Sequence, residues 1–229
     1  IKKHQKLESA RWNFYSSSDS IIQKATAEVK GFGLKIAGSG ESLEQLLNND
    51  AHIAGYHVSD EKSSQVIHQR LRKHNIEIFP VMKRTQGFIV KKGNPFHMQA
   101  IEDLLNPKIR FINRQISSGT RLLLDTLLLE RGIEPTDING YLHEEFTHSA
   151  VANAILAGKA DVGLGVKNIA IENSLGFVPL KDEIFFIAMP KEMLSHPESS
   201  KLIRKIRSYS GNTPGYKSIS LNRQVQNWL

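Results

Sequence analysis

The sequence predicts an α/β protein with a largely parallel sheet. Short apolar runs of strand length alternate with longer segments of helical periodicity through most of the 229 residues, an alternation typical of βαβ units. Junctions rich in Ser, Thr and Gly stand where several predicted helices begin, which is where capping residues are expected. With 40% hydrophobic and 23% charged residues, the chain can bury a core without help from a metal or a disulfide.

The strands are predicted from short apolar runs bounded by polar or turn-forming residues. We expect strands at residues 34–37, 53–56, 76–81, 87–90, 109–112, 161–166 and 183–189.

The helices lie between these runs and are predicted from apolar residues at three- and four-residue spacing. Gly132 and Gly158 follow the last turns of two of them, where a left-handed residue commonly ends a helix. Ser42 followed by Gln45 fits a capping box at the start of another. We expect helices at residues 20–29, 42–48, 64–74, 120–131, 149–157 and 199–208.

The composition excludes several classes of site and partner. There are no cysteines, so thiolate zinc sites, iron–sulfur clusters and thiol catalysis are ruled out. No window approaches the roughly 18 apolar residues of a membrane span, so we expect no membrane insertion. The net charge of +7 favours anionic partners. The basic residues are nevertheless scattered among acids, and we expect no direct contact with nucleic acid.

Motifs for catalysis and cofactor binding are incomplete. His143-Glu144 and His148 miss a zinc-protease motif, because histidines five residues apart lie about 140° apart around a helix. Two Gly-x-Gly pairs lack the third glycine of a dinucleotide fingerprint, and no phosphate-binding loop motif occurs. We therefore predict a chain that is not an enzyme and that holds no metal or cofactor.

The informative feature is a set of four junctions between a strand-like run and a helix. At a helix start the first backbone N–H groups have no intrahelical partner, and the helix dipole favours negative charge there. Hydroxyl side chains add O–H donors, and glycine lets a ligand approach the backbone closely. Capping alone explains a single junction of this kind, whereas four junctions with surplus hydroxyls indicate anion binding. They are residues 16–20, 38–42, 117–121 and 147–149.

Residues 111–125 resemble the N-R-Q-x-G-S-G-T-R-x-L-L-D signature of the periplasmic-binding-protein-like domain related to molybdate-binding proteins. The resemblance extends over about residues 30 to 190. The sequence departs from the family pattern at Ser117, which replaces a glycine, and in the first serine-rich loop. Further matches follow in the expected order at Gly38-Ser39, Ala54-Gly55-Tyr56-His57, residues 86–90 with 93–95, 147–152, 160–165 and 177–180.

The resemblance implies a type 2 periplasmic-binding-protein fold, in which two crossover segments join two α/β lobes and the ligand lies in a cleft between them. Residues 1–84 with 184–229 would form lobe one, and residues 85–183 lobe two. A ligand held by donors from both lobes would favour the closed form. The implied binding residues are Ser17, Ser18, Ser39, Gly40, His57, Gln86, Asn113, Arg114, Ser117, Ser118, Gly119, Thr120, Arg121, Thr147 and His148.

Two kinds of small anion fit these residues. A fully ionised oxyanion such as molybdate or tungstate needs donors only, which backbone N–H and hydroxyl groups supply. A carboxylate metabolite would more often use a bidentate arginine, for which Arg114 and Arg121 are the candidates. Arg121 is equally well placed to pair with Asp125 one helical turn away.

The resemblance leaves three settings open. The chain could be the effector-sensing domain of a transcription regulator with an upstream DNA-binding domain. It could be the periplasmic solute receptor of an ABC transporter and partner a permease, or a module attached to a molybdopterin-biosynthesis enzyme. Residues 1–12 are polar and resemble a linker, which favours the cytoplasmic regulator over the periplasmic receptor.

Overall fold

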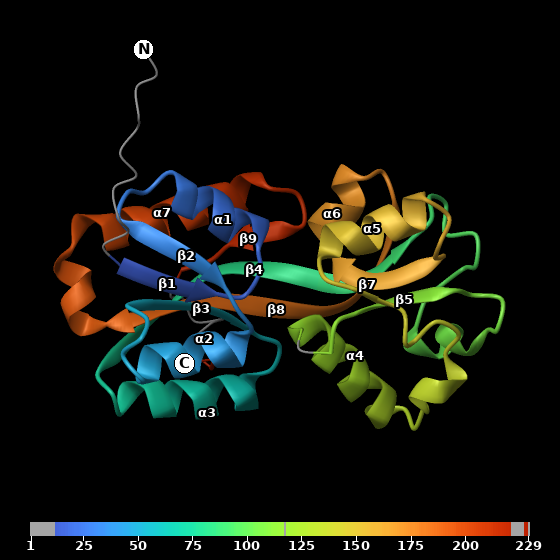
Figure 1. Cartoon of the computed structure of the whole chain (residues 1–229), viewed down its shortest axis with the longest axis horizontal. Coiled ribbons are helices and arrows are strands. Elements are labelled where there is room, and N and C mark those ends of the chain that lie inside the picture. Colours follow the sequence, from blue (N-terminus) through green and yellow to red (C-terminus); the bar gives the residue numbers. More distant parts are fainter. Residues whose placement is uncertain (1–11, 117, 221–226, 229) are drawn as a thin grey trace, which may run out of the picture. The chain divides into compact units, whose positions relative to one another are not determined.

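The computed structural model describes residues 12–116, 118–220 and 227–228. The chain divides into two compact units (Figure 1). Unit 1 contains the described residues of Ile1–Met82, Ile184–Gly211 and Ser218–Leu229, and unit 2 those of Lys83–Glu183 and Asn212–Lys217. Two unit boundaries fall inside long strands, β4 (Ile76–Val90) and β8 (Gly176–Pro190), so both units share these two strands.

Unit 1 is built on a sheet with helices on both faces. Its central strand β1 (Trp12–Ser16) pairs in parallel with β2 (Phe32–Ile36) and β3 (Ile53–Val58), and β3 pairs antiparallel with β8. Helices α1 and α7 cover one face and α2 and α3 the other (Figure 1). The bounds are α1 (Ser20–Ala27), α2 (Ser39–Leu47), α3 (Glu61–Arg72) and α7 (Pro197–Asn212).

Every second residue of β3 and β8 contributes its side chain to the core of unit 1 beneath α2 and α3. Tyr56 on β3 and Phe186 on β8 are fully buried and stack with their ring centroids 5.6 Å apart. Leu46 of α2 and Leu71 of α3 pack into the same cluster, because helical spacing presents their apolar faces to the sheet.

Unit 2 has the same layered construction. Strand β7 (Val162–Val166) pairs antiparallel with β4 and parallel with β5 (Phe111–Arg114), which pairs in parallel with the short β6 (Glu144–Glu145). Helix α4 covers one face, and α5 with α6 the other (Figure 1). The remaining bounds are α4 (Gly119–Glu130), α5 (His148–Leu156), α6 (Lys167–Glu172) and β9 (Tyr216–Ser218), which pairs with β4.

The α/β class is confirmed, and all six predicted helices are present with small shifts of their ends. Gly132 and Gly158 have φ of +63° and +70°, which confirms them as helix-terminating residues. The capping box at Ser42 is wrong. Helix α2 begins three residues earlier, its N-cap is Gly38, and the buried Ser42 hydroxyl has no partner in the described part of the chain.

Several elements differ from the prediction for physical reasons. Residues 76–81 and 87–90 belong to one strand, β4, because the polar stretch between them is held in the sheet by side chains such as Arg84, which pairs with the buried Glu183. Strands β1, β6 and β9 and helix α6 were not predicted, and each has six residues or fewer. Among the described residues, none of the helices has the length and apolar character of a membrane span.

We predict that Gly87→Ala destabilises unit 2, because a Cβ at this position would lie 2.1 Å from the Val178 carbonyl oxygen and 2.9 Å from Pro179 Cα. Backbone cannot move aside as a flexible side chain can, so we expect a loss of about 1–3 kcal/mol in the free energy of unfolding, measured by urea denaturation. Gly40→Ala is the control, since its Cβ would meet nothing within 4 Å. An equal loss in both variants would contradict this packing.

Candidate functional site

In unit 1, two of the predicted binding residues converge on a ring nitrogen of a third. Ser17 Oγ and Ser39 Oγ each lie 3.2 Å from Nδ1 of His57. The backbone N–H of His57 also donates to Ser39 Oγ at 3.3 Å. We call Ser17, Ser39 and His57 donor set 1.

The parallel pairing of β1 and β3 brings donor set 1 together. Ser16 ends β1 opposite Gly55 of β3, and the Ser17 N–H then donates to the Gly55 carbonyl at 3.0 Å. A Cβ on Gly55 would lie 2.4 Å from Ser16 Oγ, so only glycine permits this approach. His57 follows two residues later on β3, within reach of Ser17.

The hydroxyls of donor set 1 are not helix caps. Asp19 caps α1 by accepting from the Ile21 N–H at 2.9 Å, and Gly38 caps α2 without a side-chain hydrogen bond. Capping therefore does not account for Ser17 or Ser39, whose hydroxyls instead contact His57. Two other predicted residues flank the set. Ser18 is half-buried, and Gly40 is exposed in the first turn of α2 with open space around its Cα.

In unit 2, two of the predicted residues do act as caps. Ser118 Oγ accepts from the Arg121 N–H at 3.1 Å at the start of α4. Thr147 Oγ1 accepts from the Ala150 N–H at 3.0 Å at the start of α5. Ser117, between β5 and α4, lies outside the described residues.

Gly119 and Thr120 form the first turn of α4. Gly119 is half-buried, and Thr120 is only 3% exposed. The Thr120 side chain has no hydrogen-bond partner in the part of the chain that the structure describes, and its hydroxyl is not among the fully enclosed unpaired atoms. Like the hydroxyls of Ser17 and Ser39, the Thr120 hydroxyl therefore does not cap a helix.

Arg114 is a buried cation held by neutral groups. Its Nε and Nη2 donate to the carbonyls of Glu145 and Phe146 at 3.2 and 3.0 Å, and its Nη1 lies 2.9 Å from Nδ1 of His148. Among the described residues no carboxylate lies within ion-pair distance of it. Burial, together with the nearby charge of Arg84, lowers the pKa of Arg114 to about 10. A buried charge without a counterion is costly, and a bound anion would compensate it.

Arg114 also determines which nitrogen of His148 carries hydrogen. A guanidinium group can only donate, so the 2.9 Å contact requires His148 Nδ1 to accept. In the neutral ring the hydrogen is then on Nε2, and His148, the first residue of α5, presents an N–H donor at a helix start. We call Thr120, Arg114 and His148 donor set 2.

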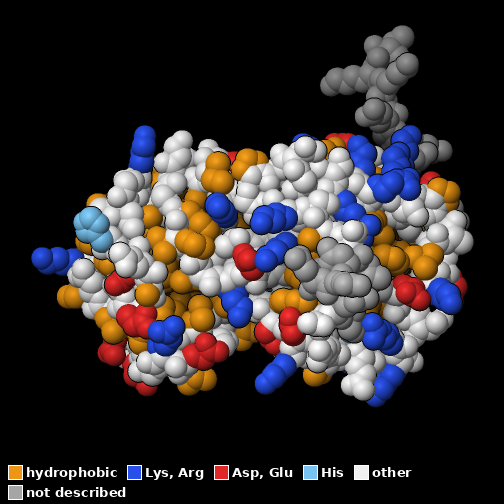
Figure 2. All heavy atoms as spheres, turned by 180° about the vertical axis from the view of Figure 1, so that it is seen from behind, with side chains coloured by type: hydrophobic (Ala, Val, Ile, Leu, Met, Phe, Trp, Pro, Cys, Tyr) orange, Lys and Arg blue, Asp and Glu red, His pale blue; other side chains and the backbone are white. Residues whose placement is uncertain are grey.

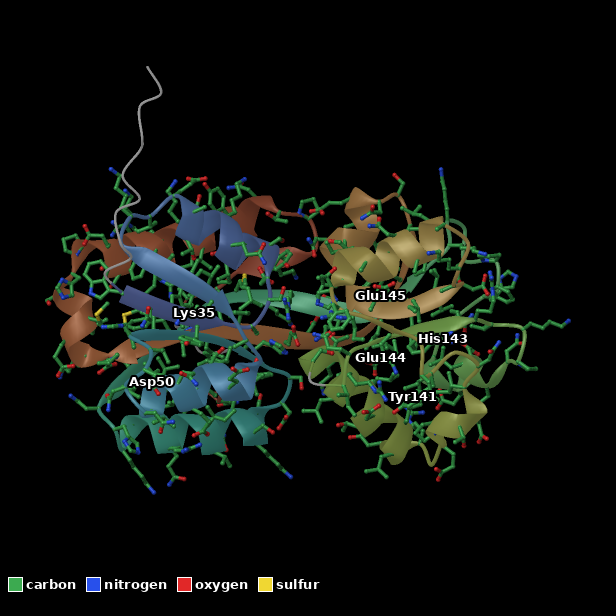
Figure 3. All side chains as sticks on the ribbon, viewed as in Figure 1. Lys35, Asp50, Tyr141, His143, Glu144 and Glu145 are labelled. Atoms are coloured by element: carbon green, nitrogen blue, oxygen red, sulfur yellow. The ribbon has the colours of Figure 1, made fainter. Side chains whose placement is uncertain are left out.

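Arg121 is committed to the interior of unit 2. Its Nε donates to Asp125 Oδ1 at 3.0 Å and its Nη1 to Glu144 Oε1 at 2.8 Å, and the guanidinium lies 4.2 Å from the centre of the Tyr141 ring. Tyr141 and Glu144 are labelled in Figure 3. The sequence was compatible with ligand binding by Arg121 and with its pairing to Asp125, and these distances confirm the pairing. Burial disfavours the charged form, but hydrogen bonds with Tyr141 and Asp125 outweigh it and raise the pKa of Arg121.

Asn113 and Gln86 are buried side chains of the strands in unit 2. Asn113 donates to the Tyr141 carbonyl at 3.0 Å and accepts from the Arg114 N–H at 2.9 Å, so it connects β5 to the next loop. Gln86 Nε2 donates to Glu183 Oε2 at 2.7 Å, while its Oε1 is enclosed without a partner in the described chain. Glu183 was not predicted from the sequence, because nothing in the local pattern indicates that Gln86 has a partner 97 residues away.

The described residues contain no group of three histidines, aspartates or glutamates that could hold a metal ion. On the face shown in Figure 2, lysines and arginines lie scattered over both units and are interspersed with acids and apolar side chains.

Comparisons with known proteins identify relatives and structural neighbours. The family described as PBP superfamily domain matches residues 23–207. The protein YvgK of Bacillus subtilis is 32% identical over 182 residues, which are 78% of this chain and 59% of YvgK, so the chain spans little more than half of that relative.

Two solved structures share the fold at low sequence identity. The regulatory domain of MetR, a LysR family regulator from N. meningitidis, has a TM-score of 0.64 at 13% identity, covering 91% of this chain and 99% of that domain. The tungstate-binding protein TupA from Desulfovibrio alaskensis has a TM-score of 0.59 at 11% identity, covering 92% and 99%. The type 2 periplasmic-binding-protein fold expected from the sequence is thus confirmed.

We predict that Arg114→Lys loosens the segment from Glu144 to Ala150, because an ammonium group cannot donate to all three acceptors of the planar guanidinium at once. Hydrogen exchange of these amides should accelerate at least tenfold, which corresponds to about 1.4 kcal/mol. Arg110→Lys is the matched control in the same unit, since Arg110 bonds to Asp161 and Gly158 instead. Unchanged exchange in Arg114→Lys would contradict the anchoring role.

Proposed function

Because this chain belongs to the PBP superfamily, we propose that it binds a small anion of the molybdate or tungstate type, without transforming it, as the effector-sensing domain of a transcription regulator. In this proposal one anion accepts hydrogen bonds from the two hydroxyls of donor set 1 and from Thr120 and His148 of donor set 2. The lobes that would close on it are residues 1–84 with 184–229 and residues 85–183.

The proposal rests on one observation. Near their helix starts, both units present side-chain hydrogen-bond donors that are not used for capping. In unit 1 these are the hydroxyls of Ser17 and Ser39. In unit 2 they are the Thr120 hydroxyl and the ring N–H of His148. Such donors stabilise negative charge most effectively where the helix dipole already favours it.

The state of the two arginines favours an oxyanion over a carboxylate metabolite. A carboxylate is typically held by a bidentate guanidinium group, but Arg121 is already paired with Asp125 and Glu144. All three nitrogens of Arg114 already contact acceptors of its own unit. In this proposal Arg114 therefore stabilises the anion by its positive charge alone. Hydroxyl and N–H groups make the direct hydrogen bonds to the anion. The likeness to TupA, a tungstate-binding protein, supports the same choice.

The likeness to the MetR regulatory domain supports a regulatory setting. The likeness to TupA supports the alternative, a solute receptor of an ABC transporter, and an upstream DNA-binding domain or a permease would be the respective partner. A regulator of this kind would act in the cytoplasm and a receptor in the periplasm.

We predict one-to-one binding of tungstate or molybdate in isothermal titration calorimetry. Ser39→Ala and Thr120→Val should each weaken binding about 10- to 100-fold, because each removes one hydroxyl bond to a charged group worth about 1.5–3 kcal/mol. Thr120→Val preserves the shape of the side chain, so its effect isolates the hydroxyl.

Ser63→Ala is the control, since Ser63 is exposed on α3 and its side chain makes no hydrogen bond in the described chain. Absence of heat with molybdate, tungstate and sulfate would contradict the proposal. Tight binding of a carboxylate metabolite in their place would favour the alternative ligand class. If only one of the two variants weakened binding, a single anion shared by both donor sets would be excluded.

A further inference from the structure

Unit 1 contains a cavity of about 670 Å³ whose described lining residues all lie outside donor set 1. Its lining includes residues 76–80 of β4, Arg72 at the end of α3 and Arg207 of α7. Helices α3 and α7 cover opposite faces of the sheet (Figure 1), so both faces contribute side chains to this cavity. Its volume is in the range that is typical of small-molecule sites.

Arg207 brings a half-buried positive charge to the cavity. Its Nη2 donates to the Pro80 carbonyl at 2.8 Å, and its Nε is enclosed without a partner in the described chain. No carboxylate of the described residues pairs with it, and its Nη1 is neither bonded nor enclosed there. Burial lowers the pKa of Arg207. A cation partly removed from water without a counterion is costly, and a bound anion would compensate it.

Arg72 supplies a second positive charge. Its side chain is exposed and has no hydrogen-bond or ion-pair partner in the part of the chain that the structure describes. A cation in the last turn of a helix is favoured by the helix dipole, which can explain Arg72. It does not explain Arg207, which lies before the last turn of α7. Glu77 is the only acid among the described lining residues, so the two arginines leave a net positive charge.

The remaining lining is mainly apolar and determines which kind of anion fits. Ile76, Ile78, Phe79 and Pro80 all line the cavity. An inorganic anion would gain nothing from these side chains, whereas an organic anion would bury its apolar part against them. A guanidinium group is the typical partner of a carboxylate.

We propose that this cavity binds a small organic carboxylate, with its carboxylate group at Arg207 and Arg72 and its apolar part against residues 76–80. The site shares no described residue with donor set 1 or donor set 2. The proposal is therefore independent of the proposed function, and tungstate should not compete with the carboxylate.

The probe that tests this site is 3-phenylpropionate, added to the full chain. Calorimetry should show saturable one-to-one binding, and nitrogen-detected amide NMR should place the shifts at residues 72–80 and around Arg207. The neutral 3-phenylpropionamide lacks the charge and acetate lacks the apolar part, so each should bind about tenfold more weakly or worse. Equal affinities of the acid and its amide would overturn the proposal. Shifts centred on Ser39 and Thr120 would also overturn it, because the carboxylate would then occupy the anion site.

Matched arginine variants test the assignment of the residues. Arg207→Met keeps an apolar stem and removes the charge, so affinity for 3-phenylpropionate should fall about tenfold and equal that for the amide. Arg204→Met is the control, since Arg204 is exposed on the same helix and does not line the cavity. Equal affinities of these two variants would overturn the role of Arg207.

Arg72→Met provides a second variant at an exposed position, which keeps the test decisive where Arg207→Met does not fold. Affinity for 3-phenylpropionate should fall about threefold, as expected for an exposed charge. Unchanged affinity in every arginine variant that folds would overturn the proposal. So would the absence of saturable binding of 3-phenylpropionate at millimolar concentration, whatever the result with tungstate.

Discussion

A hydrogen-bond donor that is removed from water needs an acceptor, and this requirement organises both units. The N–H groups at a helix start cannot pair within the helix, and a protein normally supplies a capping oxygen. Asp19, Ser118 and Thr147 meet that requirement. The hydroxyls of Ser17, Ser39 and Thr120 do not cap helices. They add further hydrogen-bond donors near helix starts, where the N–H groups already need acceptors. The anion proposed above would supply acceptors for such donors.

Much of the surrounding structure keeps these donors in place. The β1–β3 pairing and the absence of a side chain at Gly55 place Ser17 beside His57. In unit 2, Arg114 ties β5 to the start of α5 and fixes the tautomer of His148. The ion pairs of Arg121 with Asp125 and Glu144 hold the start of α4 against β6. These charged side chains thus act mainly as a framework, and the hydroxyl and imidazole groups are the ones that we propose to contact the anion.

The fold class and the helices could be predicted from the sequence, because apolar periodicity and helix-start chemistry are local signals. It predicted Ser17, Ser39 and His57 as binding residues, and the structure brings them together. It did not predict β1, which positions Ser17, because a five-residue strand next to a polar lead has little periodicity. The capping box at Ser42 was wrong because Gly38, without a side-chain signal, caps α2 instead. The partners of Arg121 on β6 and the pairing of Arg84 with Glu183 depend on tertiary contacts that no local pattern encodes.

The most direct test of this account is a crystal structure of the chain with tungstate, whose anomalous scattering locates the metal independently of the protein. The account predicts one strong tungsten peak, with oxygens of the anion within hydrogen-bond distance of the Ser39 and Thr120 hydroxyls. A peak that contacts only one of the two donor sets, or none in crystals soaked far above the solution affinity, would contradict it.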